Sequence, residues 1–278
     1  MRLSFSTNAF VSCSVFDAVE CIGSLGYDAV ELLADAPHLY ADTVTESDLS
    51  KLRTSLKKAK LQVANINANT AVGYYGRTFW EPLFEPSLAN PDSSARRWRL
   101  NYSKKCIEMA RTLEASCISI TSGRPVPGAL PEQSLDLLRE SLRELLEYAA
   151  ERSVRIGIEY EPGLLVERCE ELTAILDHMS SVHLGANLDL GHSHVLGENP
   201  EAVIKDLGER IFHVHMEDIK ARKHYHLIPG TGDLDFNHLL ELLRAHRYDG
   251  FITVELYTYP HRAEQAAREA LEFLRSLP

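Results

Sequence analysis

The 278-residue sequence predicts a single (β/α)8 barrel, the TIM-barrel class of α/β folds. Short apolar runs with the composition of buried strands alternate with longer segments of helical periodicity, and we count eight such pairs. Strict alternation calls for parallel strands, and eight units close into a barrel more readily than they form an open sheet. No linker or shift in composition divides the chain, so we expect one domain over residues 1–278. A doubly wound open sheet is the alternative fold.

The first half of the chain supplies four of the predicted strands and three of the helices. Gly26 ends the first helix at a position that favours glycine, and Thr45 with Asp48 forms a capping box that begins the second. The third strand is followed by an aromatic, proline-bearing segment, and a loop of this length is usually functional or disordered. Its aromatic residues favour a lid over a flexible linker. We expect a lid-like insertion around residues 70–95, with its aromatic part at Tyr74–Trp80. The predicted strands are 3–7, 28–33, 61–67 and 117–121, and the predicted helices are 16–25, 45–60 and 97–113.

The second half repeats the alternation more regularly. A leucine stripe at helical spacing marks the first helix of this half, and Asn199-Pro200 is an N-cap followed by proline at the first helical position. The predicted strands are 155–159, 184–189, 211–215 and 251–255. The predicted helices are 132–152, 170–179, a helix beginning at Asn199, 236–245 and 261–277.

Four polar side chains end the last four predicted strands: Glu159, Asp189, His215 and Glu255. In a barrel these ends share one mouth, where three carboxylates would repel one another unless a cation or protons compensated them. Oxygen donors with one imidazole suit a single divalent ion, Mn²⁺, Mg²⁺ or Co²⁺, and Zn²⁺ also fits. Each residue alone is consistent with a loop cap, and Asp189 with His192 is also consistent with a helix cap beside a buried histidine. Glu31, at the end of the second strand, is expected either to orient a ligand or to form a plain salt bridge.

The net charge, the cysteines and the apolar content of the sequence indicate which classes of molecule the protein binds. Twenty-nine lysines and arginines against 40 aspartates and glutamates give a net charge of −11, which repels nucleic acid and anionic membranes. The five cysteines form no CxxC pair, and no apolar stretch has the length of a membrane span or a signal sequence. We therefore expect a cytoplasmic protein with a small-molecule partner, no nucleic-acid partner and no membrane association.

The motifs together resemble the xylose isomerase-like TIM-barrel superfamily, over nearly the whole chain. The resemblance rests on Ile158-Glu159, Asn187-Leu-Asp189 with His192 beyond it, His213-Val-His215, Pro229-Gly-Thr-Gly232 and Val254-Glu255. That superfamily includes sugar isomerases and epimerases, inosose and dehydroshikimate dehydratases, and abasic-site endonucleases. The resemblance implies that Glu159, Asp189, His215 and Glu255 bind one divalent metal and that His192 lies beside the substrate.

The function expected from this resemblance is a metal-dependent isomerase or epimerase of a ketose, sugar phosphate or cyclic polyol. The metal would polarise a carbonyl and stabilise an enediolate, while Glu159 and Glu255 exchange the neighbouring proton from opposite faces. We expect His192, His226 and Glu161 to bind the substrate, and the protein to form a homodimer or homotetramer.

Departures from related patterns bear on the alternatives. Endonucleases of the superfamily need histidine ligands after strands three and four, where this chain has Asn67, Asn69 and Thr121. Ketose 3-epimerases often carry arginine where this chain has His226, with His224 alongside. Glu161 and Glu217 stand where dehydratases tend to have histidine and lysine. A dehydratase of an inosose-like or dehydroshikimate-like substrate remains the main alternative. An abasic-site endonuclease and a non-catalytic sugar-binding barrel are disfavoured.

Overall fold

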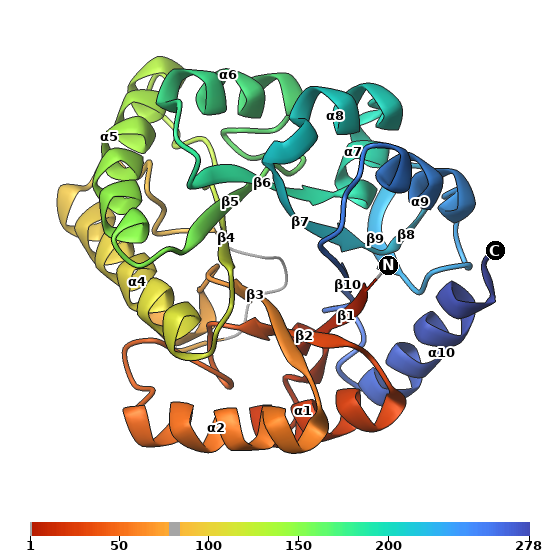
Figure 1. Ribbon diagram of the computed structural model, residues 1–278. Coiled ribbons are helices and arrows are strands. Elements are labelled where there is room, and N and C mark those ends of the chain that lie inside the picture. Colours follow the sequence, from red (N-terminus) through yellow and green to blue (C-terminus); the bar gives the residue numbers. More distant parts are fainter. Residues whose placement is uncertain (1, 78–83) are drawn as a thin grey trace.

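The protein folds into a closed barrel of parallel strands, which confirms the predicted fold class. The computed structural model describes residues 2–77 and 84–278. Around the barrel the strands follow the order β1-β10-β7-β6-β5-β4-β3-β2, and Figure 1 looks down it with helices forming the outer ring. The barrel strands are β1 (Arg2–Ser6), β2 (Ala29–Leu33), β3 (Gln62–Asn67), β4 (Cys117–Thr121), β5 (Arg155–Glu159), β6 (Leu184–Asp189), β7 (Ile211–Met216) and β10 (Phe251–Val254).

Amphipathic helices cover the outside of the barrel and bury their apolar faces against it. Their ends follow the capping chemistry of the sequence: Thr45 and Asp48 form the predicted capping box, and Gly26 is left-handed with φ 96°. Within the described residues, no helix is both long enough and apolar enough to span a bilayer. The larger helices are α1 (Val15–Leu25), α2 (Glu46–Ala59), α4 (Ser93–Thr112), α5 (Pro131–Ala150), α6 (Cys169–Met179), α8 (Pro200–Leu207), α9 (Phe236–Ala245) and α10 (Ala263–Ser276).

Several short elements at or near the barrel ends are absent from the sequence prediction. They are the 3-10 turns η1 (Thr7–Phe10) and η2 (Gly208–Arg210), the short helices α3 (Val72–Tyr75) and α7 (Leu190–Leu196), and an antiparallel hairpin of β8 (Asp218–Lys220) and β9 (Lys223–Leu227). The hairpin forms a separate two-stranded sheet after β7.

Several predicted boundaries shift by one to four residues. Helix α4 begins at Ser93 rather than Arg97, because the Asp92 carboxylate accepts hydrogen bonds from the amides of Ser94 and Ala95 and caps the helix earlier. The last helix begins two residues later than predicted, at Ala263, and β10 ends at Val254, so Glu255 directly follows its strand.

The start of the predicted lid-like insertion is anchored by one buried carboxylate. Asp35 accepts hydrogen bonds from the amides of Ala71, Val72 and Gly73 at 2.7–2.9 Å and from the Thr70 hydroxyl at 2.6 Å. Tyr74 packs on the Trp98 ring of α4 with centroids 4.2 Å apart. Thr78, Phe79 and Trp80, the rest of the aromatic part of the prediction, lie outside the described residues.

Candidate metal centre

Four side chains converge at the carboxyl ends of β5, β6, β7 and β10. One donor atom from each of Glu159, Asp189, His215 and Glu255 lies within 4.8 Å of the others. The register of the strands explains the convergence. Asp189 of β6 and Thr253 of β10 are both paired with His215 of β7, and Glu255 follows Thr253 by two residues. All four side chains are buried, with at most 7% of any residue exposed. The structure therefore brings together the four residues that the sequence predicts as ligands.

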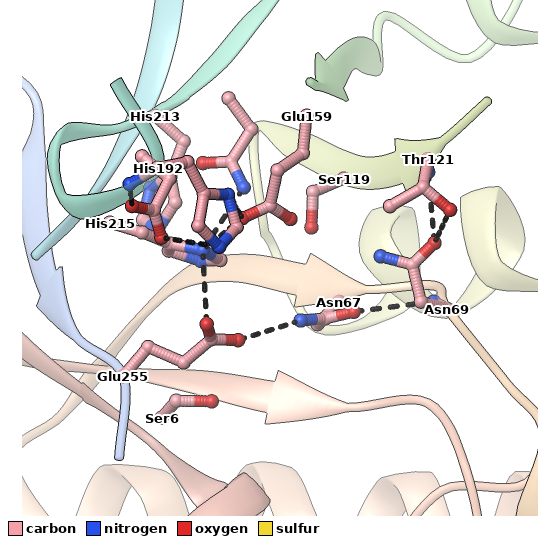
Figure 2. A network of polar contacts seen from close by, with 12 residues as sticks. Ser6, Asn67, Asn69, Ser119, Thr121, Glu159, His192, His213, His215 and Glu255 are labelled. Carbon is pink, nitrogen blue, oxygen red and sulfur yellow. Dashed lines mark hydrogen bonds and ion pairs between the residues drawn. The ribbon is translucent and has the colours of Figure 1, made fainter. Parts of the chain in front are cut away.

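His215 lies between carboxylates on both sides of its ring. Its Nδ1 is 2.9 Å from Glu159 Oε1 and 3.8 Å from Glu255 Oε2. Figure 2 draws His215 with both glutamates. Its Nε2 is 2.6 Å from Glu31 Oε2. Burial lowers the pKa of His215, but the carboxylates of Glu31, Glu159 and Glu255 outweigh it and hold the pKa well above its usual range. In the metal-free protein the imidazole thus carries the positive charge among these acids.

Glu31 orients His215 and is itself held by hydrogen bonds from the two neighbouring strands. The Ser6 hydroxyl donates to Glu31 Oε1 and the Asn65 amide to Oε2, both at 2.8 Å. His213 Nε2 lies 3.4 Å from Glu31 Oε2. A carboxylate that binds one ring nitrogen of a histidine leaves the other nitrogen available to a metal. In His215 the available nitrogen is Nδ1, which faces the centre. Two roles were expected for Glu31, orienting a ligand or forming a plain salt bridge, and the geometry favours the first.

The two carboxylate oxygens of Asp189 have different surroundings. Oδ1 accepts the His192 backbone N–H at 2.7 Å and caps α7, whereas the buried Oδ2 has no hydrogen-bond partner among the described residues. A buried carboxylate oxygen without a partner is costly unless a proton or a cation satisfies it. The interpretation of Asp189 as a helix cap is therefore correct for Oδ1, and Oδ2 remains available to bind a cation.

Glu255 is held by amides and surrounded by acids. Its Oε1 accepts from Asn8 Nδ2 at 2.8 Å and from Asn67 Nδ2 at 3.4 Å. Burial raises its pKa, and the carboxylates of Glu159, Glu31 and Asp189 raise it further, against the lowering effect of His215. In the described part of the chain no lysine or arginine forms an ion pair with Glu159, Asp189 or Glu255. Three carboxylates with one imidazole and an unsatisfied oxygen fit one divalent cation.

The predicted substrate-binding residues separate into two groups. His192 on α7 and His226 on β9 lie beside the centre: His192 Nε2 is 3.8 Å from Asp189 Oδ2, and His226 Nδ1 is 3.6 Å from Glu255 Oε2. His224 lies between these two imidazoles. Glu161 is buried beyond β5 and does not belong to any group of converging donors in the described residues. Burial raises its pKa well above the usual range, as do the carboxylates of Glu159, Glu255 and Asp189.

Glu217 is a buried acid to which the sequence analysis gave no role. Both of its oxygens lack hydrogen-bond partners among the described residues, and one oxygen joins Asp189 and His192 in a donor group. It can approach because residue 191 is glycine: a Cβ there would lie 1.7 Å from Glu217 Oε1. Burial, Asp189 and Glu255 raise its pKa well above the usual range. The alternation of side chains along a strand, two residues after His215, is the signal that could have indicated it.

Comparison with known proteins gives the chain a family. The family model described as a xylose isomerase-like TIM barrel matches residues 19–277. A fructoselysine 3-epimerase from Shigella flexneri is 26% identical over 258 residues, which cover 91% of this chain and 89% of the relative. An inosose dehydratase from Clostridium botulinum is 27% identical over 141 residues, 45% of this chain and 47% of the relative.

Among solved structures, a crystal structure of the IOLI protein with a bound zinc atom has the same fold. It aligns with a TM-score of 0.81 at 20% identity, over 99% of this chain and 97% of that one. The two curated relatives are both enzymes, an epimerase and a dehydratase. Since the family model covers nearly the whole sequence, the chain belongs to the xylose isomerase-like TIM-barrel family.

Proposed function

We propose that the protein is a divalent-metal-dependent isomerase or epimerase of a ketose, sugar phosphate or cyclic polyol. The observation that carries the proposal is the convergence of three carboxylates and one imidazole from four adjacent strands, all buried and without a compensating lysine or arginine in the described residues. The fructoselysine 3-epimerase relative supports the reaction class, and the zinc atom of the IOLI structure supports a metal in this fold. Zn²⁺, Mn²⁺, Mg²⁺ and Co²⁺ all fit the donor set.

The two glutamates are the acid and base of the proposed reaction. A cation bound by Glu159, Asp189, His215 and Glu255 would polarise the substrate carbonyl and stabilise the negative charge of the enediolate. One glutamate carboxylate takes the proton from the carbon next to the carbonyl, and the C–H electron pair moves into the new carbon–carbon double bond. The other glutamate returns a proton to the opposite face, which inverts that carbon.

The placement of the two glutamates supports this division of labour. Strands β5 and β10 are separated by β6 and β7 in the barrel, so Glu159 and Glu255 approach Nδ1 of His215 from different strands and different directions (Figure 2). Two carboxylates that flank a substrate can invert a centre, whereas one alone restores the original configuration. His192, His226 and Glu161 are proposed to bind substrate oxygens, and the insertion around residues 70–95 to exclude water.

Dehydration remains the second candidate because an inosose dehydratase is among the relatives. It would use the same metal and the same first proton abstraction but would expel a hydroxyl group as water. The two reactions differ in product: a dehydratase forms a conjugated enone, which absorbs in the ultraviolet, and an epimerase does not.

The decisive experiment is turnover of a panel of ketoses, inososes and keto acids in D₂O with Mn²⁺, Co²⁺, Mg²⁺ or Zn²⁺ added. We expect deuterium on the carbon next to the carbonyl, because the glutamic acid that returns the proton has already exchanged its own proton with the solvent. Glu159→Gln and Glu255→Gln should each lower turnover by roughly 10²–10⁴-fold, the range for a lost general acid or base.

The control is Glu170→Gln on the exposed side of α6, which should keep full activity. Metal content is measured in each variant, so that a lost base is distinguished from a lost cation. Epimerised product without any deuterium would exclude proton transfer and require a hydride shift instead. Full activity in metal-stripped protein would overturn the metal dependence.

A further inference from the structure

A cavity lies at the end of the barrel opposite the candidate metal centre. Its volume is about 460 Å³, within the usual range for small-molecule sites of roughly 300–1,000 Å³. The first residues of four barrel strands line it: Arg2, Gln62, Arg155 and Phe251. The four candidate metal ligands lie at the carboxyl ends of their strands, so the cavity shares none of them.

The walls of this cavity are positively charged, although the net charge of the whole chain is −11. Four lining residues are basic and two are acidic, a local excess of two positive charges: Arg2, Arg53, Lys57 and Arg155 against Glu114 and Asp249. Arg53 pairs with Glu114 at 3.2 Å. Among residues 2–77 and 84–278, no carboxylate forms an ion pair with Arg2, Lys57 or Arg155. Unpaired cations around a concave surface attract an anion.

Two of the arginines are held in place by phenyl rings. The guanidinium carbon of Arg2 lies 4.0 Å from the ring centroid of Phe251. That of Arg155 lies 4.5 Å from the ring centroid of Phe212. Within the described part of the chain, each guanidinium makes a single hydrogen bond, Arg2 to a carbonyl oxygen at 2.8 Å and Arg155 to a hydroxyl at 3.4 Å. A guanidinium has five N–H donors, and its planar fork matches the oxygens of a phosphate group, so most of the donors are available to such an anion.

An apolar surface completes the cavity. Leu56, Leu61 and Val63 are buried and line it together with the basic groups. Inorganic phosphate alone would leave this surface and most of the volume unused, and the net charge of −11 opposes a longer polyanion such as nucleic acid. We propose that the cavity binds a phosphate monoester of a small organic molecule. The phosphate lies on Arg2 and Arg155, and the organic part lies on the apolar surface.

The first test is calorimetric titration with AMP, UMP and glycerol phosphate, beside adenosine, uridine, glycerol and inorganic phosphate. We expect at least one ester to bind, and its unphosphorylated partner not to bind, at concentrations up to about 10 mM. None of these probes is a ketose, so the result does not depend on the proposed function. No binding by any of the three esters overturns the proposal, as does equal affinity for inorganic phosphate.

The second test uses variants of the basic residues. Arg155→Gln should weaken binding of the ester by about 10–100-fold, the effect of losing a charge-assisted hydrogen bond. Lys57→Gln should also weaken it. The matched control is Lys58→Gln: Lys58 follows directly on α2, pairs with Glu20 at 3.5 Å and does not line the cavity. Both lysine variants lose one charge, so an equal effect of the two overturns the proposal, as does unchanged affinity in a folded Arg155→Gln.

A measurement on the unmodified protein guards against misfolding of a variant. When the ester that binds most tightly is titrated into the wild type, the amide NMR signals of Ser116, Gly250 and Phe251 should move, because these residues line the cavity. The amide signal of His192, beside the candidate metal centre, should not. Shifts confined to the carboxyl ends of the strands would place the phosphate at the metal centre and overturn the second site.

Discussion

At the scale of single residues, the two nitrogens of His215 connect the candidate metal centre to Glu31, which supports it. Nδ1 faces Glu159 and Glu255, and Nε2 is bound by Glu31. The convergence of the four candidate ligands could be predicted from the sequence because each ends an apolar run, and parallel strands end at one mouth. Their supports could not, because Asn8, Asn65 and Asn67 reach the centre only through the curvature of the closed barrel and have no distinguishing local pattern.

We predict that Glu31→Gln weakens binding of the metal at the four-ligand centre by roughly 10–100-fold, the usual effect of losing a group that orients a ligating histidine. The amide removes the negative charge that holds His215 Nε2–H and leaves Nδ1 less basic. Affinity is measured by competition with a chromophoric chelator, beside the surface variant Glu151→Gln. Unchanged affinity in Glu31→Gln would show that Glu31 forms only a buried salt bridge.

At the scale of elements, the hairpin β8–β9 is the largest feature that the sequence did not predict. Its two-residue turn places Ala221 and Arg222 in the left-handed region, with φ 51° and 55°. Turns of that type are usually recognised by Asn-Gly or Asp-Gly, and Ala-Arg gives no such signal. The short helix α7 was missed for a different reason: its seven residues are too few to show a helical periodicity.

The motif Pro229-Gly-Thr-Gly232 serves this hairpin. Its backbone wraps around Asp218, whose Oδ2 accepts from the amides of Gly230 and Gly232 at 2.9 and 2.7 Å. A Cβ at Gly232 would lie 2.3 Å from Asp218 Oδ1 and 2.4 Å from the Ile219 carbonyl oxygen. The glycine is thus required by close approach of the chain rather than by a turn.

We predict that Gly232→Ala lowers the free energy of unfolding by about 2–4 kcal/mol, the range for overpacking combined with loss of buried hydrogen bonds. Gly163→Ala is the comparison: its added Cβ meets nothing within 4 Å, so only the left-handed backbone, φ 84°, costs energy, about 1 kcal/mol. Both are measured by urea denaturation. Equal effects of the two substitutions would contradict a packing role for Gly232.

At the scale of the whole molecule, the barrel gathers buried acid at one end. Glu31, Glu159, Glu161, Asp189, Glu217 and Glu255 are all buried there, in a protein whose net charge is −11. Length and alternation were enough to predict the closed barrel, because eight βα units have few other ways to bury their apolar faces. The depth of the acidic mouth could not be predicted, since burial of each carboxylate depends on loops that return over it.

Metal affinity should rise with pH as a result. The pKa values of His215 and Glu255 are both raised in the metal-free protein, so both groups keep protons to higher pH than they would in water. A cation must displace these protons, and this competition weakens as pH rises through the raised pKa values. Calorimetric titration of Mn²⁺ at several pH values, in buffers of different ionisation enthalpy, measures both affinity and the protons released. Affinity that is independent of pH between 6 and 8, about the range in which histidine titrates, would contradict the raised pKa of His215.

The hairpin β8–β9 shares no ladder with the barrel, and Arg222 at its turn rests on the Val195 carbonyl oxygen of α7 through two hydrogen bonds of 3.2 and 3.1 Å. A substitution within it alters side chains beside the candidate metal centre, such as His226, without shifting the register of any barrel strand. Side chains on the hairpin that do not pack against Asp218 can therefore change while the barrel keeps its strand pairing. The hairpin is accordingly the segment to exchange when a different ligand is to be recruited to the same fold.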